Sequence, residues 1–171
     1  MSDSVNSVLL DTDVFSYLLK TGDRRGGLYQ PHVQGKTIAV TFVTVGELLY
    51  GAAKKNWGKK KLALLQQRLR SAVIVPYDAQ ICRTYGTLKH TLRSSGRVLA
   101  DNDLWIAACA LRHGLPLVSN NRKHFEGIPN LTLISEAPLI AVIESQQHLP
   151  LVPSGSSATE SEPPSERSPS G

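Results

Sequence analysis

Short apolar segments alternate along this chain with longer segments in which apolar residues recur at helical spacing. The short segments are rich in β-branched residues, which favours strands. They cover Val5–Leu10, Thr37–Val43, Ala72–Pro76, Leu115–Ser119 and Leu131–Ile134. Continuous apolar strands alternating with helices are typical of a mostly parallel sheet that is covered by helices on both faces. The alternation therefore predicts an α/β fold.

Helices are expected between these strands, and their ends are marked by capping residues. Asp78 is expected to cap a long helix that runs to about Ser95, and Gly114 closes the helix that begins at Asp103. The remaining helices are expected from about Thr12 to Lys20, and over 44–55, 59–70 and 138–147. Residues 22–31 contain three glycines and a proline, which predicts a loop.

The chain of 171 residues divides into one domain over 1–149 and a Ser/Pro/Glu-rich tail over 150–171, which is predicted to be disordered. The whole chain has a net charge of +5. Because the tail carries −2, the domain carries +7. A basic domain favours a polyanionic partner such as nucleic acid. The sequence contains neither an apolar stretch long enough to cross a membrane nor a secretory signal, so we expect a cytoplasmic location and no membrane contact. Cys82 and Cys109 are expected to be buried free thiols.

Five of the acidic residues of this basic domain fall in three apolar surroundings, VLLDTDVF, FVTVGELLYG and LADNDLWIAACA. These residues are Asp11, Asp13, Glu47, Asp101 and Asp103. In parallel sheets, functional sites form where the strands end, and Asp11 directly follows a predicted strand. Several carboxylates brought together need a cation between them, and Mg²⁺ prefers such oxygen ligands. A bound divalent ion can activate water for phosphodiester hydrolysis.

Each acid also has a purely structural interpretation. Asp13 could cap the first helix, Thr44 and Glu47 fit a capping box, and either Asp101 or Asp103 could cap the helix that follows. His124 is expected to have a surface role. The lysine-rich stretch 54–61 around Trp57 could follow a phosphate backbone or could be a solvated helix face.

Four segments resemble the PIN-domain family and, within it, the VapC-type ribonuclease toxins of type II toxin–antitoxin systems. VLLDTDVFSYLL, FVTVGELLYGA and GRVLADNDLWIAACAL resemble the segments that carry the family's first three acids, here Asp11, Glu47 and Asp103. LVSNNRKHFEGIPNL is similar to the closing segment, which places Ser119 at its Ser/Thr position and Asn121 at its fourth acid position. Asp101 could share the role of Asp103.

The resemblance implies a three-layer α/β/α sandwich over residues 1–149 and an endoribonuclease that depends on Mg²⁺, with Mn²⁺ as a substitute. It implies that Asp11, Glu47 and Asp103 hold the metal while Ser119 and Asn121 position a water molecule. It also implies an RNA substrate, a homodimer and a VapB-like antitoxin as partners.

Two other functions stay open at this point. VLLDTD also resembles the start of haloacid-dehalogenase phosphatases, in which Asp11 would be the nucleophile and Asp13 the acid/base. Alternatively, the chain could be an RNA-binding module without nuclease activity, or an RNA-maturation protein with the same fold.

Overall fold

Five strands form a single sheet in the computed structural model, which describes residues 6–147. They are β1 (Ser7–Leu10), β2 (Thr37–Thr41), β3 (Val73–Val75), β4 (Leu117–Val118) and β5 (Leu133–Ile134). The strand order is β3-β2-β1-β4-β5, and every neighbouring pair is parallel. The predicted α/β fold is therefore confirmed, and the predicted tail lies outside the described residues.

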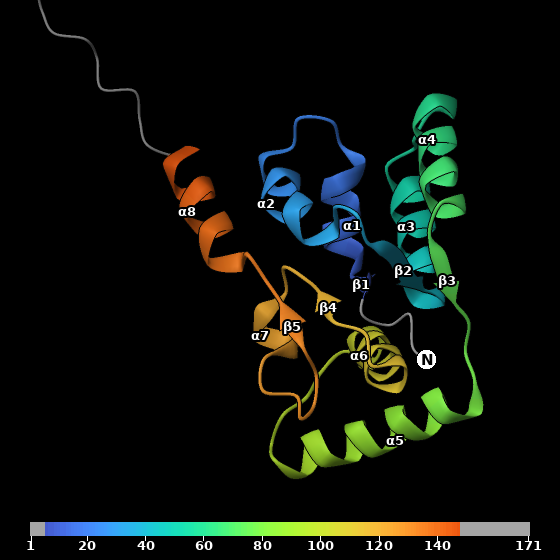
Figure 1. Cartoon of the computed structure of the whole chain (residues 1–171), viewed down its shortest axis with the longest axis vertical. Coiled ribbons are helices and arrows are strands. Elements are labelled where there is room, and N and C mark those ends of the chain that lie inside the picture. The colour runs from blue at the N-terminus through green and yellow to red at the C-terminus, as the bar shows by residue number, and fades with distance from the viewer. Residues whose placement is uncertain (1–5, 148–171) are drawn as a thin grey trace, which may run out of the picture.

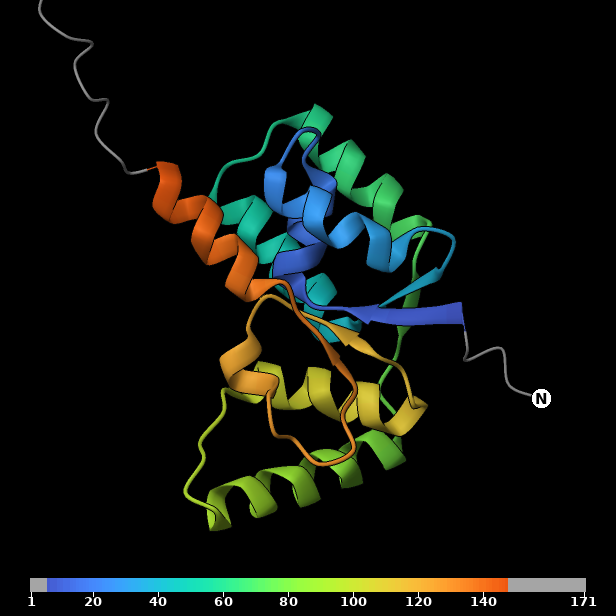
Figure 2. The same cartoon turned by 60° about the vertical axis from the view of Figure 1, so that its left-hand side comes forward.

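Helices cover both faces of this sheet, which gives the expected three layers (Figures 1 and 2). One layer contains α1 (Thr12–Leu19), α2 (Arg24–Val33), α3 (Phe42–Lys54), α4 (Lys59–Arg70) and α8 (Ala137–Gln147). The other contains α5 (Ala79–Ser94), α6 (Asp101–His113) and the short α7 (Arg122–Phe125). No helix in the described part of the chain is long and apolar enough to span a membrane.

The strands contribute side chains to two hydrophobic cores, one on each face of the sheet, because successive side chains of a strand point to opposite faces. On β1, Leu9 packs into the core beneath α5 and α6, while Val8 and Leu10 pack into the core beneath α1–α4. Leu117 and Val118 of β4 divide in the same way. Strands buried on both faces explain why the apolar segments of the sequence are continuous.

Helix α2 occupies the segment predicted to be a loop, so that prediction was wrong. Its N-cap is Asp23, whose Oδ1 accepts a hydrogen bond from the Arg25 backbone N–H at 3.0 Å. Gly26 lies against α1 so closely that an added Cβ would be 2.7 Å from the Tyr17 carbonyl oxygen. Packing between the helices therefore outweighs the weak helix propensity of its glycines.

Two other predictions need correction. Helix α3 begins at Phe42, because Thr41 caps it by accepting a hydrogen bond from the Thr44 N–H at 3.0 Å. The capping box proposed for Thr44 and Glu47 is therefore wrong, and Glu47 lies in the second turn. Of the two cysteines, Cys109 is buried as expected, but Cys82 is exposed.

Candidate active site

The predicted site residues Asp11 and Ser119 meet where two central strands end. Asp11 follows β1 and Ser119 follows β4, and the chain connections from β1 and β4 lead to opposite edges of the sheet. Such a reversal of strand order is where open α/β sheets form their sites. Asp11 is 5% exposed and Ser119 is fully buried. Ser119 Oγ donates a hydrogen bond to Asp11 Oδ2 at 2.6 Å.

Asp11 is also the N-cap of α1, accepting a hydrogen bond from the Thr12 N–H on Oδ1 at 2.7 Å. The sequence had favoured Asp13 as the cap, which was wrong. Asp13 lies inside the first turn instead, where its Oδ1 accepts a hydrogen bond from the Val14 N–H at 2.6 Å. Two carboxylates are thus fixed by backbone groups at the start of one helix.

Negative charge is concentrated at this end of the sheet. Burial raises the pKa of Asp11 to about 7, and repulsion from Asp13 and Asp103 acts in the same direction against the two hydrogen bonds. Burial and Asp103 also raise the pKa of Asp13. Within residues 6–147, neither Asp11 nor Asp13 forms an ion pair with a lysine or arginine. The fold therefore brings three acids from α1 and α6 into electrostatic contact.

Asp103 is held by a residue that the sequence had placed on the surface. His124 Nδ1 lies 2.6 Å from Asp103 Oδ2 and 2.6 Å from Asn121 Nδ2. Asn121 is connected to the centre of the site as well, since its backbone N–H donates to Ser119 Oγ at 2.9 Å. His124 is exposed, as expected, but α7 directly after β4 brings its ring to Asp103, a contact that no metal-ligand spacing in the sequence marks.

Glu47 connects α3 to both sides of the acid cluster. The Thr12 hydroxyl donates a hydrogen bond to Glu47 Oε2, and Asn102 Nδ2 donates to Glu47 Oε1 at 2.8 Å. Thr12 lies between Asp11 and Asp13, and Asn102 precedes Asp103 on α6. Glu47 is therefore held beside the cluster by residues adjacent to its members.

Asp101 does not join the cluster. Its Oδ1 lies 2.6 Å from Lys89 Nζ and accepts a hydrogen bond from the Tyr85 hydroxyl at 2.8 Å, and both partners are on α5. The Lys89 ammonium group lowers the pKa of Asp101, in contrast to the raised pKa of Asp11. Helix α6 starts at Asp101 with Ala100 as a cap that lacks a side-chain hydrogen bond, so neither Asp101 nor Asp103 is an N-cap.

The chemistry of this donor set fits a hard divalent cation. The donors are carboxylate, hydroxyl and amide oxygens, and the cluster has excess negative charge in a buried position. In residues 6–147, no three Asp, Glu, His or Cys side chains already form a ready group of ligands. Asp103 Oδ2 and both Glu47 carboxylate oxygens already have partners in His124, Thr12 and Asn102, and each carboxylate keeps lone pairs with which it could hold an ion.

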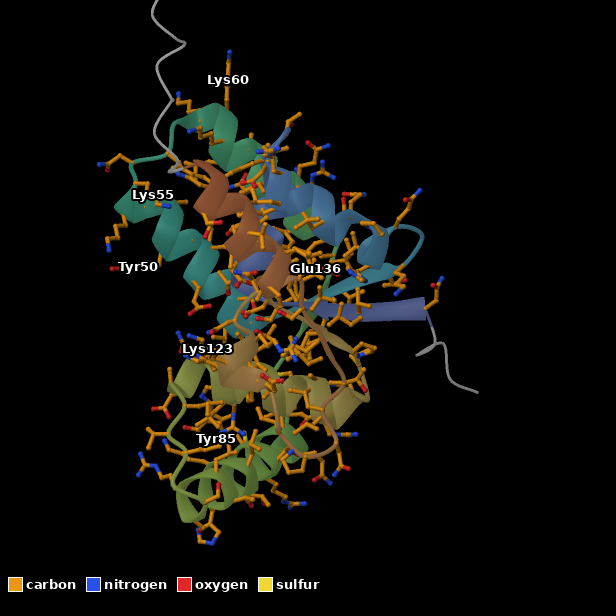
Figure 3. All side chains as sticks on the ribbon, turned by 90° about the vertical axis from the view of Figure 1, so that its left-hand side faces the viewer. Tyr50, Lys55, Lys60, Tyr85, Lys123 and Glu136 are labelled. Carbon is orange, nitrogen blue, oxygen red and sulfur yellow. The ribbon has the colours of Figure 1, made fainter. Side chains whose placement is uncertain are left out.

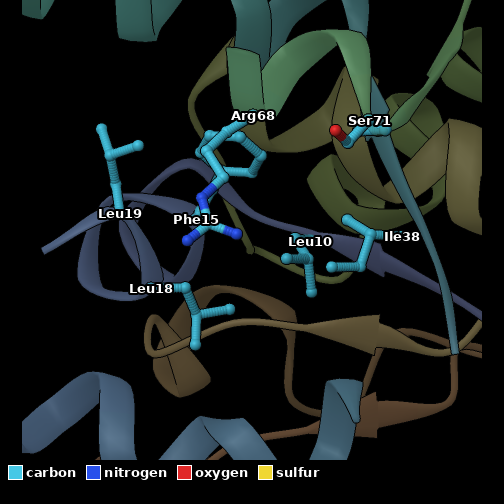
Figure 4. Close-up of a pocket in the computed structure, with 8 residues that line it drawn as sticks. Leu10, Phe15, Leu18, Leu19, Ile38, Arg68 and Ser71 are labelled. Atoms are coloured by element: carbon cyan, nitrogen blue, oxygen red, sulfur yellow. The ribbon is translucent and has the colours of Figure 1, made fainter. Parts of the chain in front are cut away.

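A pocket elsewhere in the molecule offers no such chemistry. Leu10, Phe15, Leu19 and Ile38 line a hollow of about 90 Å³ between α1, α4 and the sheet, with Arg68 at its rim (Figure 4). No carboxylate lines it. The acid cluster, rather than this pocket, is therefore the candidate active site.

Comparison with known proteins identifies the family of this chain. The PIN domain model matches residues 8–130. A ribonuclease VapC2 of Haemophilus influenzae is 32% identical over 120 residues, which are 70% of this chain and 90% of the relative. A ribonuclease VapC2 of Rickettsia felis is 33% identical over 129 residues, which are 73% of this chain and 94% of the relative.

A solved structure points to the same family. The crystal structure of VapBC2 from Rickettsia felis, bound to a DNA fragment from their promoter, matches with a TM-score of 0.67 at 29% identity. The match covers 75% of this chain and 98% of that chain. The chain therefore belongs to the PIN domain family, and within that family it is of the VapC type.

Proposed function

We propose that this chain is a metal-dependent endoribonuclease that hydrolyses RNA phosphodiester bonds and acts as the toxin of a toxin–antitoxin pair. The observation that carries the proposal is the cluster of Asp11, Asp13 and Asp103 at the reversal of strand order, in which no lysine or arginine of residues 6–147 pairs with Asp11 or Asp13 and Asp103 faces His124. The ribonuclease names of the VapC relatives support the reaction and the substrate class. The basic charge of residues 1–149 suits RNA.

In this proposal, Asp11, Glu47 and Asp103 hold Mg²⁺, with Mn²⁺ as a substitute, and Asp13 adds negative charge beside them. The bound ion would activate water and stabilise the charge that develops on the phosphate. Ser119 fixes the orientation of the Asp11 carboxylate, and Asn121 fixes Ser119 through its backbone N–H. Ser119 and Asn121 are therefore positioning residues in this mechanism.

A VapB-like antitoxin is the expected partner, because the matched crystal structure is a VapBC complex. The homodimer and the cytoplasmic location stay predictions. Membership of the PIN family leaves the phosphatase interpretation of VLLDTD without support. An RNA-binding module without nuclease activity would bind RNA without cutting it in the presence of Mg²⁺. A protein of RNA maturation would keep the same cleavage chemistry, and a neighbouring antitoxin reading frame would favour the toxin over it.

Cleavage of pooled RNA by the purified full chain tests the proposal. We expect cutting with Mg²⁺, none with EDTA, and a loss of about 100-fold or more for Asp11→Asn. Asp101→Asn is the matched control. Like Asp11, Asp101 lies at the start of a helix, but it is paired with Lys89 outside the acid cluster. It should cut like the wild type. Persistent cutting by a folded Asp11→Asn protein, or equal losses in both variants, would refute the site assignment.

A further inference from the structure

Five lysines crowd the end of the α3–α4 hairpin that lies away from the sheet. They are Lys54, Lys55, Lys59, Lys60 and Lys61, and we call them, together with Trp57, the lysine tip. All five lysines are exposed. None of them forms an ion pair with any residue in the described range 6–147. The lysine tip is thus a concentrated positive surface that the described part of the protein does not neutralise.

The position of these charges disfavours the helix that carries them. Lys59, Lys60 and Lys61 form the first turn of α4, which contains no acid, and the N-cap Gly58 makes no side-chain hydrogen bond. A helix N-terminus carries partial positive charge, so lysines there are repelled and acids would be favoured. A sequence that opposes its own local structure, with no contact that offsets the cost, is expected where residues serve a function. A polyanionic ligand bound at the lysine tip would be attracted both by the lysines and by the helix N-terminus.

Aromatic side chains accompany the lysines in the way that RNA-binding surfaces combine them. Lys55, Trp57 and Lys59–Lys61 line a hollow, and Lys61 Nζ lies 6.0 Å from the Trp57 ring centroid. One helical turn before Lys54, Tyr50 is 67% exposed, and the Lys54 Nζ lies 6.0 Å from its ring centroid. The exposed Tyr50 ring is free to stack with a base, whereas Trp57 is half-buried against the core beneath α1–α4. In surfaces that bind single strands, rings stack with bases while lysines hold the phosphates.

The lysine tip begins at the end of the helix that carries Glu47 of the candidate active site, since Lys54 is the last residue of α3, whereas Lys59–Lys61 belong to α4. Seven residues separate Glu47 from Lys54, which is roughly 10 Å along the α3 axis. Figure 3 shows Tyr50, Lys55 and Lys60 following one another along the hairpin, with Lys123 and Tyr85 on the other half of the molecule. An RNA strand cut at the acid cluster could therefore extend along α3 to the lysine tip.

We propose that the lysine tip binds the phosphate backbone of the RNA substrate at a distance from the bond that is cut. This inference rests on the proposed function. The competing candidate ligand is the chain's own acidic segment 150–171, which contains Glu160, Glu162 and Glu166. RNA is favoured because the exposed Tyr50 ring accompanies the lysines and extends the surface toward Glu47.

The test measures RNA affinity of the full chain in the Asp11→Asn background, by fluorescence anisotropy with a labelled structured RNA and a six-nucleotide RNA. Lys59→Glu/Lys60→Glu reverses two charges of the lysine tip. We expect it to weaken binding of the long RNA roughly tenfold or more and to reduce the salt-dependence slope by roughly 1.5 to 2. Binding of the six-nucleotide RNA should change much less. The melting temperature should stay equal or rise, because the new acids suit the helix N-terminus.

Lys36→Glu/Arg83→Glu is the matched control. It makes the same change in net charge outside the lysine tip, at two residues that form no ion pair within residues 6–147. The proposal is overturned if this control weakens binding equally, or if Lys59→Glu/Lys60→Glu leaves affinity for the long RNA unchanged. It is also overturned in favour of segment 150–171 if Lys59→Glu/Lys60→Glu no longer weakens RNA binding once Glu160→Gln/Glu162→Gln/Glu166→Gln is introduced, because the tip would then affect RNA only through that segment. Because affinity is measured without cleavage, failure of the nuclease proposal would appear separately, as absence of cutting by the wild type.

Discussion

At the residue scale, Asp11 combines two roles that oppose each other. Its carboxylate caps α1 and accepts the Ser119 hydroxyl, which stabilises the folded chain. The same carboxylate is buried beside Asp13 and Asp103, which destabilises its charged form. The raised pKa indicates that burial and repulsion outweigh the hydrogen bonds. A residue kept in this state is typical of a functional site.

This balance predicts how stability depends on pH in EDTA. Because the pKa of Asp11 rises from 3.8 to about 7 on folding, the folded protein binds that proton more tightly than the unfolded chain between these pH values. The contribution of Asp11 therefore disfavours folding progressively as pH rises through this window. Asp11→Asn should raise the free energy of unfolding by about 1–3 kcal/mol at pH 8 and change it little at pH 4.

Urea unfolding at both pH values measures this difference. Asp101→Asn is the control, because Lys89 lowers the pKa of Asp101 and the substitution removes a favourable ion pair. It should bring no gain in stability at pH 8. A loss of stability at pH 8 in the Asp11→Asn variant would mean that the hydrogen bonds of Asp11 outweigh its burial.

Sequence alone predicted the acids of the candidate site but not which way their side chains point. Asp11, Glu47 and Asp103 follow from their apolar surroundings and from the family motifs. Asp101 and Asp103 are two residues apart, so their side chains point about 200° apart around α6. One faces Lys89 on α5 and the other faces His124. This choice depends on how α6 is rotated on the sheet, which the local sequence does not encode.

At the element scale, α2 shows where tertiary packing overrides local preference. Its two glycines and its proline predict a loop, yet the helix buries Tyr29 and Val33 against α1 and the sheet. The Tyr29 hydroxyl also accepts a hydrogen bond from the Glu136 N–H at 3.0 Å and donates toward the end of β4. Helix α2 thus supports the turn that carries Ser119, a role visible only after folding.

The two adjacent glycines of α2 should respond oppositely to substitution by alanine. At Gly26 a Cβ would meet the Tyr17 carbonyl at 2.7 Å, so Gly26→Ala should separate α1 from α2 and cost about 1–3 kcal/mol. At Gly27 nothing lies within 4 Å, so Gly27→Ala should stabilise the protein by about 0.5–1 kcal/mol through helix propensity. Thermal unfolding of both variants measures this contrast. Equal effects would show that helix propensity, rather than packing against α1, decides the outcome.

At the scale of the whole molecule, the acid cluster connects the two helical layers. Asp11 and Asp13 belong to the layer of α1–α4, whereas Asp103 belongs to α6 on the opposite face of the sheet. The alternation of the sequence predicted the parallel sheet and its two covered faces. The strand order could not be derived from that alternation, and this order brings β1 beside β4 and the two layers to one site.

A cation bound between the layers should therefore stabilise the entire fold. Binding to the folded state alone raises stability by about 2.7 kcal/mol when the free metal is 100 times its dissociation constant. We expect Mg²⁺ or Mn²⁺ to raise the melting temperature of the wild type more at pH 8 than at pH 6, because protons compete for Asp11 at the lower pH. Asp11→Asn should lose most of this increase, and Asp101→Asn should keep it. An equal increase in both variants would mean that the metal binds elsewhere, because Asp101 is held by α5 and only Asp11 lies between the two layers.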